Sequence, residues 1–310
     1  MQLRTQFPDL FLASMLPALD EVIFSSLKFD RFPPQFSNVF RVMDSKRSIE
    51  QTSEVSGVGT FTVVGEGENL RYDQAVPGFS KTYTHLQYGL GFKMTRVMVD
   101  DDKFSIITKL ASDLGNSAKE TIELDAVSDF INGFSSSYLG PDGVALFSTS
   151  HPLYKSGGVQ SNTGTAADLD IASLEVALTL FRRMKDPSGK KMRIKPQTLI
   201  VPPELEFQAS EIINATMRSD TANNTPNAFK NRVGMPSFED LVVWEYLTDP
   251  DSWFISTDKA QTELRFYWRE KPNTVHDVDF DSRSVKTGMW FRESHGWSTF
   301  YGIFGNPGTY

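Results

Sequence analysis

A histidine and several hydroxyl side chains lie next to one another in ALFSTSHPLYKSGGVQSN, residues 145–162. Ser150 and His151 are residue types that can form a nucleophile and its general base in hydrolases. Catalytic pairs of this kind are assembled from residues far apart in the chain, however, and Pro152 restricts the backbone of His151 to extended conformations. We therefore expect a structural turn whose hydroxyl groups satisfy backbone groups, with a hydrolase as the weaker alternative.

Few other residues could support catalysis or bind a metal. The four histidines are far apart, and none has the spacing of a metal-binding pair. The chain has no cysteine, no G-x-S-x-G nucleophile motif and no phosphate-binding glycine loop. Glu66 and Glu68 could form the carboxylate pair of a glycosidase, but their glycine-rich surroundings indicate solvated side chains on a loop tip. We expect no catalytic residue, no metal and no cofactor.

Seven basic residues and one aspartate occur in RRMKDPSGKKMRIK, residues 182–195. Basic side chains at the end of a helix suit the helix dipole, so a solvated helix end and turn is the simpler interpretation. The alternative is a patch that contacts a polyanion or an acidic neighbour, such as the glutamates of residues 49–80 in another copy. The residues of this patch would be Arg182, Arg183, Lys190, Lys191 and Arg193. The net charge of −8 and the pI of about 5.1 disfavour tight nucleic-acid binding through phosphates.

The elements that must position these residues begin with an apolar N-terminal segment. Residues 1–48 are interrupted by several prolines, which predicts an extended arm with one short helix near residues 10–24. An apolar arm needs a surface to lie on, which could belong to its own domain or to a neighbouring subunit. The segment lacks the pattern of a signal peptide, and no stretch is apolar for the roughly 18 residues of a membrane span. We therefore expect a cytoplasmic setting and no membrane contact.

Residues 49–80 are rich in glycine and hydroxyl side chains. A β-prone run at 60–64 and a glycine turn at 65–67 precede a second β-prone run at 81–99. Together these runs predict a long two-stranded excursion with a polar tip. An isolated two-stranded ribbon is marginally stable in water, so we expect something outside the chain to support it.

The strongest periodic pattern runs from Phe104 to Phe134, with apolar residues at steps of three or four. It predicts one amphipathic helix over about residues 101–137, roughly 45–50 Å long, with the carboxylates of residues 100–102 at its N-terminus. The remaining pattern predicts a helix at 171–184 capped by Asp168 or Asp170, a turn at 186–189, a strand at 197–202, a helix from Pro203, a loop at 223–232 and a series of C-terminal strands. The fold class is α+β.

Four stretches in this order resemble a known family: KTYTHLQYGLGFKMTR, LFSTSHPL, GVQSN and DPSGKKMRIKPQTLIVPPELE. They are similar to the Hong Kong 97 capsid fold of tailed-phage major capsid proteins and, more narrowly, to the Mu-type major head subunit family. The resemblance implies an N-terminal arm at 1–48, an extended β loop at 49–80, a peripheral domain with a long spine helix at 81–139, an axial domain at 140–262, and peripheral-domain strands with a C-terminal return at 263–310.

The function that the resemblance implies is structural, with no enzyme activity. Copies would self-assemble into pentamers and hexamers of an icosahedral shell around double-stranded DNA, built in the host cytoplasm and retained in the virion. Because the partners of the arm and the loop would then be other copies, the loop would lie over a neighbouring subunit. Its intersubunit contacts would be Glu54, Glu66, Glu68, Arg71 and Asp73.

Other partners follow from the same resemblance. The fold accounts for nearly the whole length, so we expect a separate scaffolding protein, a portal at one vertex and only loose contact with packaged DNA, and the resemblance also allows a decoration protein. We expect no isopeptide crosslink between Lys81 and Asn273, because no activating glutamate is evident. The alternatives are an encapsulin-like bacterial nanocompartment shell of the same fold and, less favoured by the long helix, a tail tube subunit.

Overall fold

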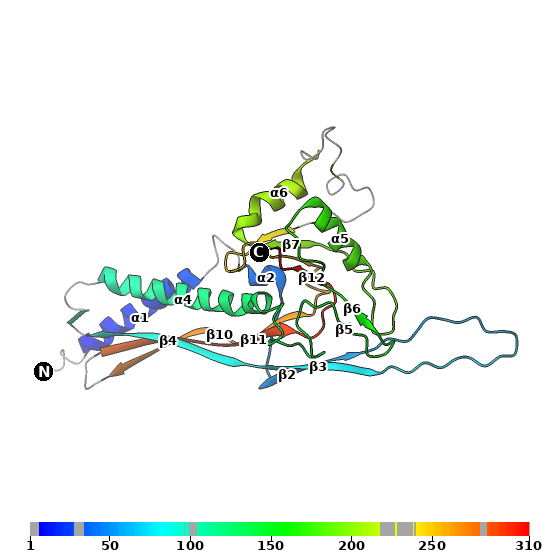
Figure 1. Ribbon diagram of the computed structural model, residues 1–310. Helices are drawn as coiled ribbons and strands as arrows, with labels where there is room; N and C mark the ends of the chain where they lie inside the picture. The colour runs from blue at the N-terminus through cyan, green and yellow to red at the C-terminus, as the bar shows by residue number, and fades with distance from the viewer. Residues whose placement is uncertain are drawn as a thin grey trace.

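The computed structural model describes residues 6–27, 34–95, 97–98, 104–217, 227, 238, 240–279 and 284–309, and its fold is a mixed α+β arrangement (Figure 1). The helices are α1 (Gln6–Leu27), α2 (Phe36–Val39), α4 (Phe104–Ile131), α5 (Ile171–Arg182) and α6 (Glu206–Asn214), with a 3₁₀ turn at Pro203–Leu205. The strands are β1 (Arg41–Asp44), β2 (Ile49–Val55), β3 (Pro77–Thr84), β4 (Leu86–Thr95), β5 (His151–Pro152), β6 (Val159–Gln160), β7 (Thr198–Val201), β8 (Asp240–Val243), β9 (Trp253–Ser256), β10 (Leu264–Asp279), β11 (Ser284–Trp297) and β12 (Ile303–Asn306).

An elongated sheet and a long helix form the lower part of the molecule in Figure 1. The strand order is β1-β10-β11-β4, and α4 and α1 cover one face. The predicted periodic helix is confirmed as α4, whose 28 residues span about 42 Å at 1.5 Å per residue. Its apolar stripe is buried at Ile107, Ala111, Leu114, Ala118, Ile122, Ala126 and Phe130. The carboxylates expected at its start lie outside the described residues.

The helix predicted near residues 10–24 is confirmed as α1, and its greater length corrects the expectation that the surrounding arm is extended. α1 continues over 22 residues through Pro17, and the side chains of Met15, Leu19 and Ile23 are buried. Its backbone approaches α4 so closely that a Cβ on Gly115 would come within 2.6 Å of the Ile23 carbonyl oxygen. The helix therefore lies on the chain's own spine helix, and the inference that the arm's partner is another copy is wrong for this part of it.

A second, compact sheet has the strand order β12-β9-β7-β8, with α5 and α6 beside it. Asp170 caps α5, because its side chain accepts a hydrogen bond from the Ser173 amide while the Ser173 hydroxyl accepts one from the Asp170 amide. The predicted strand at 197–202 and the helix beginning at Pro203 are confirmed. Most of the predicted loop at 223–232 lies outside the described residues.

The C-terminal strands divide between the two sheets. β10 and β11 belong to the elongated sheet, whereas β12 pairs with β9 in the compact one. The grouping of residues 263–310 in one unit is therefore too simple, and β1 from the expected arm likewise joins the elongated sheet. Rings of Phe130, Trp244 and Phe254 pack together at centroid distances of 5.1–5.3 Å, which makes the cores of the two sheets continuous. Among the described helices, none is long and apolar enough to cross a membrane.

Candidate functional site

A long loop projects from the body of the protein at the paired ends of β2 and β3 (Figure 1). The two strands are antiparallel from the Ile49–Thr84 pair to the Val55–Pro77 pair, and residues 56–76 continue beyond them. The expected glycine turn is confirmed, since the Glu68 amide donates to the Gly65 carbonyl at 3.1 Å and Gly67 has a φ of +83°. The expected strand at 60–64 is wrong, because these residues have no strand partner within the described chain.

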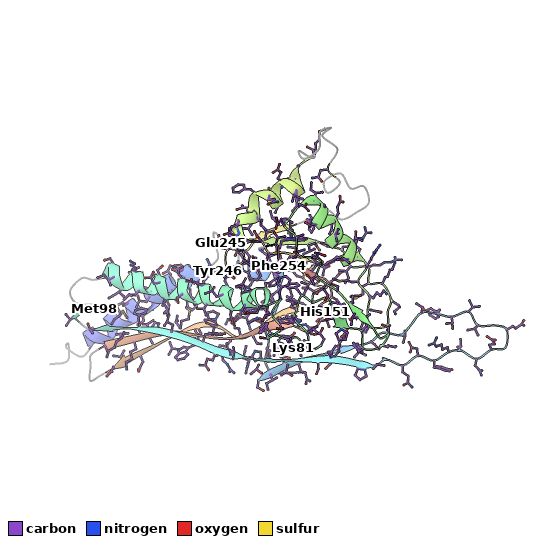
Figure 2. All side chains as sticks on the ribbon, viewed as in Figure 1. Lys81, Met98, His151, Glu245, Tyr246 and Phe254 are labelled. Atoms are coloured by element: carbon purple, nitrogen blue, oxygen red, sulfur yellow. The ribbon has the colours of Figure 1, made fainter. Side chains whose placement is uncertain are left out.

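The tip of this loop exposes large apolar side chains. Phe61 and Val63 are fully exposed, and Tyr72 is 88% exposed. Figure 2 shows side chains spreading from both sides of the loop without meeting the rest of the molecule. Exposed aromatic and aliphatic groups gathered on one segment are typical of an interaction surface. Of the predicted contact residues, Glu66, Glu68 and Arg71 are exposed at this tip.

The base of the loop is held by a turn of the compact domain. Lys155 Nζ donates hydrogen bonds to the carbonyl oxygens of Gly57 and Gln74, at 2.8 and 2.9 Å, and to Asp73 Oδ2 at 3.0 Å. One lysine thus binds both sides of the loop. The Ser188 hydroxyl adds a bond to the Gly57 carbonyl at 2.8 Å. The amide of Gly59 and then Lys155 hold the pKa of Asp73 below its ordinary value, so this carboxylate is part of the attachment.

An aromatic contact lies beside this attachment. The rings of Tyr154 and Phe79 meet edge to face with centroids 5.4 Å apart. A Cβ on Gly78 would come within 2.4 Å of the Tyr154 ring, so this position of β3 needs a glycine. The residues Tyr154 and Lys155, just before the glycine-rich stretch 156–162, therefore face the loop base.

Glu54, predicted as an intersubunit contact, instead faces its own chain. It lies half-buried near the base of the loop and lines a small pocket with Tyr301 and Phe79. Burial raises the pKa of Glu54 to about 7; a hydrogen bond with Tyr301 opposes the shift, and the nearby Glu263 carboxylate adds to it. The five predicted contact residues thus divide into three at the tip and two, Glu54 and Asp73, at the base.

Replacing Lys155 with methionine is expected to loosen the loop without unfolding the domain. The variant keeps the apolar stem and loses the three bonds to Gly57, Asp73 and Gln74. Hydrogen exchange at the amides of Gly59 and Val76, which bond across the loop base, should accelerate severalfold. The matched control is Lys286→Met, because Lys286 pairs with Asp279 at 3.3 Å at the hairpin end of β10 and β11, on the elongated sheet. Unchanged exchange in Lys155→Met would show that the lysine does not hold the loop.

His151 is fully buried and has no free nitrogen for catalysis. Its Nδ1 is 2.6 Å from Asp142 Oδ2, its Nε2 is 3.0 Å from Asn162 Oδ1, and its ring stacks on Phe300. The Ser150 hydroxyl bonds to the Ser148 hydroxyl at 3.2 Å rather than to the imidazole. Figure 2 places His151 inside the compact domain, between Phe254 and Lys81 in this view. This geometry corresponds to the expected structural segment, although the histidine binds side chains rather than backbone groups.

A buried ionic network joins the spine helix to β11. His295 Nδ1 lies 2.8 Å from Asp129 Oδ2, and its Nε2 lies 3.3 Å from Asp125 Oδ2. Burial alone would lower the pKa of His295, but the Asp129 and Asp125 carboxylates outweigh it and raise the pKa well above its ordinary value. Burial, together with the Asp125 charge, raises the pKa of Glu293 to about 9. These shifts favour an imidazolium at His295 and a protonated Glu293 at neutral pH.

The pH dependence of stability should reveal the protonated Glu293. Its pKa is about 4.5 when unfolded and about 9 when folded, so the native state holds an extra proton between these values. As the pH rises across this window, the free energy of unfolding should therefore fall by about 1.4 kcal/mol per pH unit from this proton alone. Glu293→Gln keeps the neutral shape and should make the curve less steep than that of the wild type between pH 5 and 9, as measured by urea unfolding, although His295 keeps a slope of its own above pH 6.5. A curve as steep as that of the wild type would contradict this assignment.

The basic segment forms a structured, solvated turn after α5. Arg182 lies in the last helical turn, Gly189 has a φ of +83°, and Lys185 and Lys191 face each other in a backbone bridge. The side chains of Arg182, Arg183, Lys191 and Arg193 are exposed, whereas Lys190 is half-buried beside Asp186. In the single chain these residues thus form an exposed helix end and turn. Contact of these residues with a partner stays a prediction.

Sequence reasoning missed the residues that hold the loop. Lys155 and Tyr154 lie 75–98 residues from their partners, so no local pattern marks them. The only available signal was Gly78 at the start of a strand, since a glycine inside a strand often marks a close approach. No group of His, Asp and Glu residues suited to a metal ion occurs in the part of the chain that the structure describes.

These features define a class of protein. The folded body of the protein holds the base of a loop whose apolar tip is exposed and unpaired in the described chain. Its buried histidines bind neighbouring side chains. These features are typical of a subunit that associates with other chains. The chain belongs to the phage capsid protein family, whose pattern matches residues 79–301. It is therefore a structural protein of the bacteriophage head, and membership of this family implies a non-enzymatic role.

Solved structures with the same fold include a phage capsid and two other phage proteins. The capsid of bacteriophage JBD30, decorated with minor capsid protein trimers, has a TM-score of 0.54 and 14% identity over 69% of this chain and 91% of that one. A Mycobacterium phage Adephagia protein has a TM-score of 0.54 and 10% identity over 89% and 90% of the two chains. A Gordonia phage Cozz protein has a TM-score of 0.54 and 9% identity over 89% and 87%. At these identities the likeness shows the fold alone. No curated protein sequence matches this chain.

Proposed function

We propose that the chain is the major capsid subunit of a tailed phage and has the Hong Kong 97 type of fold, in its Mu-type branch. The observation that carries the proposal is the loop of residues 56–76, held at its base by Lys155 and exposing Phe61 and Val63 completely. Burying these groups against another copy would remove apolar surface from water at about 25 cal/mol per Å². The family membership and the capsid neighbours support the same proposal.

In this proposal the subunits form pentamers and hexamers of an icosahedral shell around double-stranded DNA. The elongated sheet with α4 is the peripheral domain, and the compact sheet with α5 and α6 is the axial domain. The loop lies over a neighbouring copy and contacts it through Phe61, Glu66, Glu68 and Arg71. A separate scaffolding protein, a portal vertex and loose contact with the DNA complete the assembly, which takes place in the host cytoplasm.

Electron microscopy of the purified chain, expressed alone and with a scaffolding protein, tests the proposal. We expect closed shells with pentameric and hexameric units. A chain that sediments only as a monomer in both preparations would contradict the proposal. The contents of particles purified from cells distinguish a capsid from the encapsulin-like alternative. A capsid holds double-stranded DNA, whereas a nanocompartment holds protein cargo. The family match favours the capsid.

A further inference from the structure

One edge of this acidic protein is strongly basic. The chain has a net charge of −8, yet five exposed cations follow α5 within a short segment. This set, here called the basic hairpin, consists of Arg183, Lys185, Lys191, Arg193 and Lys195. The last four lie beyond the end of α5, so the helix dipole does not explain them.

The basic hairpin is mounted rigidly beside the loop base. The Lys185 amide donates to Gln160 Oε1 at 2.7 Å, and the Ser156 amide donates to the Pro187 carbonyl at 2.9 Å. Ser188 in the same hairpin bonds to Gly57 of the loop. The basic hairpin therefore has a fixed position next to the loop base.

The start of α6 presents the complementary chemistry. Glu204, Glu206 and Glu211 are exposed there, and Phe207 between them is 84% exposed. The helix dipole explains carboxylates in the first turn of a helix, but it does not explain why the apolar Phe207 ring is exposed. This surface, here called the acidic helix face, offers both charge for lysine and arginine and a ring for a cation–π contact.

The two surfaces lie on opposite edges of the compact domain. In Figure 1 α6 forms its upper left edge, whereas the basic hairpin adjoins β6 on the right. They cannot meet within one copy. Two different complementary patches on opposite edges produce a head-to-tail contact, which closes into a ring when its rotation permits.

We propose that the basic hairpin of one copy binds the acidic helix face of the next copy, and that this contact selects the neighbour within each ring of subunits. The inference rests on the proposed shell function, and it names the partner of the basic patch as α6 rather than the loop glutamates or DNA. The glutamates at the loop tip are a weaker match, because Arg71 lies among them. Salt should weaken the contact, since the screening length falls from about 10 Å at 0.1 M to about 3 Å at 1 M.

Charge reversal on each side tests the contact. One variant carries Lys191→Glu and Arg193→Glu, and the other carries Glu204→Lys and Glu206→Lys. Each variant alone should need at least about tenfold more protein to assemble, as measured by sedimentation velocity. An equimolar mixture should recover assembly in part, because alternating variants join unlike surfaces at every contact of a hexamer but not at every contact of a pentamer. A single chain with all four substitutions should recover assembly more fully, because each of its contacts joins a glutamate surface to a lysine surface in either ring.

The outcomes separate the possible failures. Single variants that assemble like the wild type, or a folded chain with all four substitutions that stays dissociated, would overturn the inference. Loss of binding to a double-stranded DNA fragment in the first variant, with assembly unchanged, would assign the basic hairpin to DNA instead. If circular dichroism shows that a single variant is misfolded, two other tests take its place. Assembly of Phe207→Ser and assembly of the wild type at high salt should both be weaker. Wild type that never assembles refutes the proposed function and not this contact alone.

Discussion

Excising residues 60–72 from the loop is expected to abolish shell formation while leaving the subunit folded. The cut falls between Gly59 and Asp73, whose amide and carboxylate are 2.5 Å apart, so a Gly-Ser-Gly bridge can join the ends. The bonds of Lys155 to Gly57, Asp73 and Gln74 lie outside the cut and remain. The excised residues include the fully exposed Phe61 and Val63, so the subunit loses almost no buried surface. Each contact in the proposed shell, in contrast, loses its overlying loop.

Unfolding and assembly are measured separately in this test. The urea midpoint should change little, whereas electron microscopy should show no closed particles. A double Phe61→Ser and Tyr72→Ser chain keeps the loop length and should also assemble poorly, which separates apolar contact from reach. Val176→Ser is the matched control, because Val176 is 58% exposed on α5, away from the loop. Normal shells from the excised chain would refute the assigned role of the loop.

The same loop shows why local sequence could not complete the fold. Residues 60–64 are β-branched or aromatic, and such residues favour strands only when a neighbouring strand is available. Within the described chain that partner is missing, so the run stays unpaired. The long helix was predictable because its 3.6-residue period depends on the chain itself and on one buried face. Sequence periodicity was thus enough to predict α4, whereas the pairing of strands could be established only from the structure.

The N-terminal helix was predicted near residues 10–24, and the structure extends it to Gln6–Leu27. Proline usually interrupts a helix because it lacks an amide donor, so the prolines of this segment led the sequence interpretation to a short helix within an extended arm. In the structure the burial of Met15, Leu19 and Ile23 against α4 offsets this local cost. The close approach at Gly115 was the one available signal, since a glycine in a long helix often has a packing reason.

The buried network was also beyond local prediction. Asp125 and Asp129 lie on α4, and Glu293 and His295 lie on β11, more than 160 residues away in the chain. Their spacing of four on a helix and of two on a strand fits the periods of those elements, so each pair shares one face. Nothing in the sequence shows that the two faces meet. The charged side chains nevertheless fix the position of the spine helix on its sheet.

Replacing His295 with alanine should therefore cause one of the largest losses of stability that a single substitution can produce here. Asp129 is fully buried, and its partners are His295 at 2.8 Å and the Tyr138 hydroxyl at 2.9 Å. Removing the imidazolium leaves a buried carboxylate with no opposing charge, which costs about 3–5 kcal/mol in comparable cases. Urea unfolding of the dissociated subunit at pH 6 measures this cost.

The pH profile and a matched histidine distinguish a lost ion pair from a simple cavity. Because the pKa of His295 is raised in the folded state, its contribution is complete below about pH 6.5 and disappears as pH rises through the folded value. The difference between wild type and His295→Ala should shrink in the same direction. His276→Ala is the control, since His276 pairs with Asp20 at 2.9 Å and that carboxylate is one-third exposed, so its loss should cost about 1 kcal/mol. A pH-independent loss, or equal losses in both variants, would mean that His295 acts by filling space and that charge does not hold α4 on the sheet.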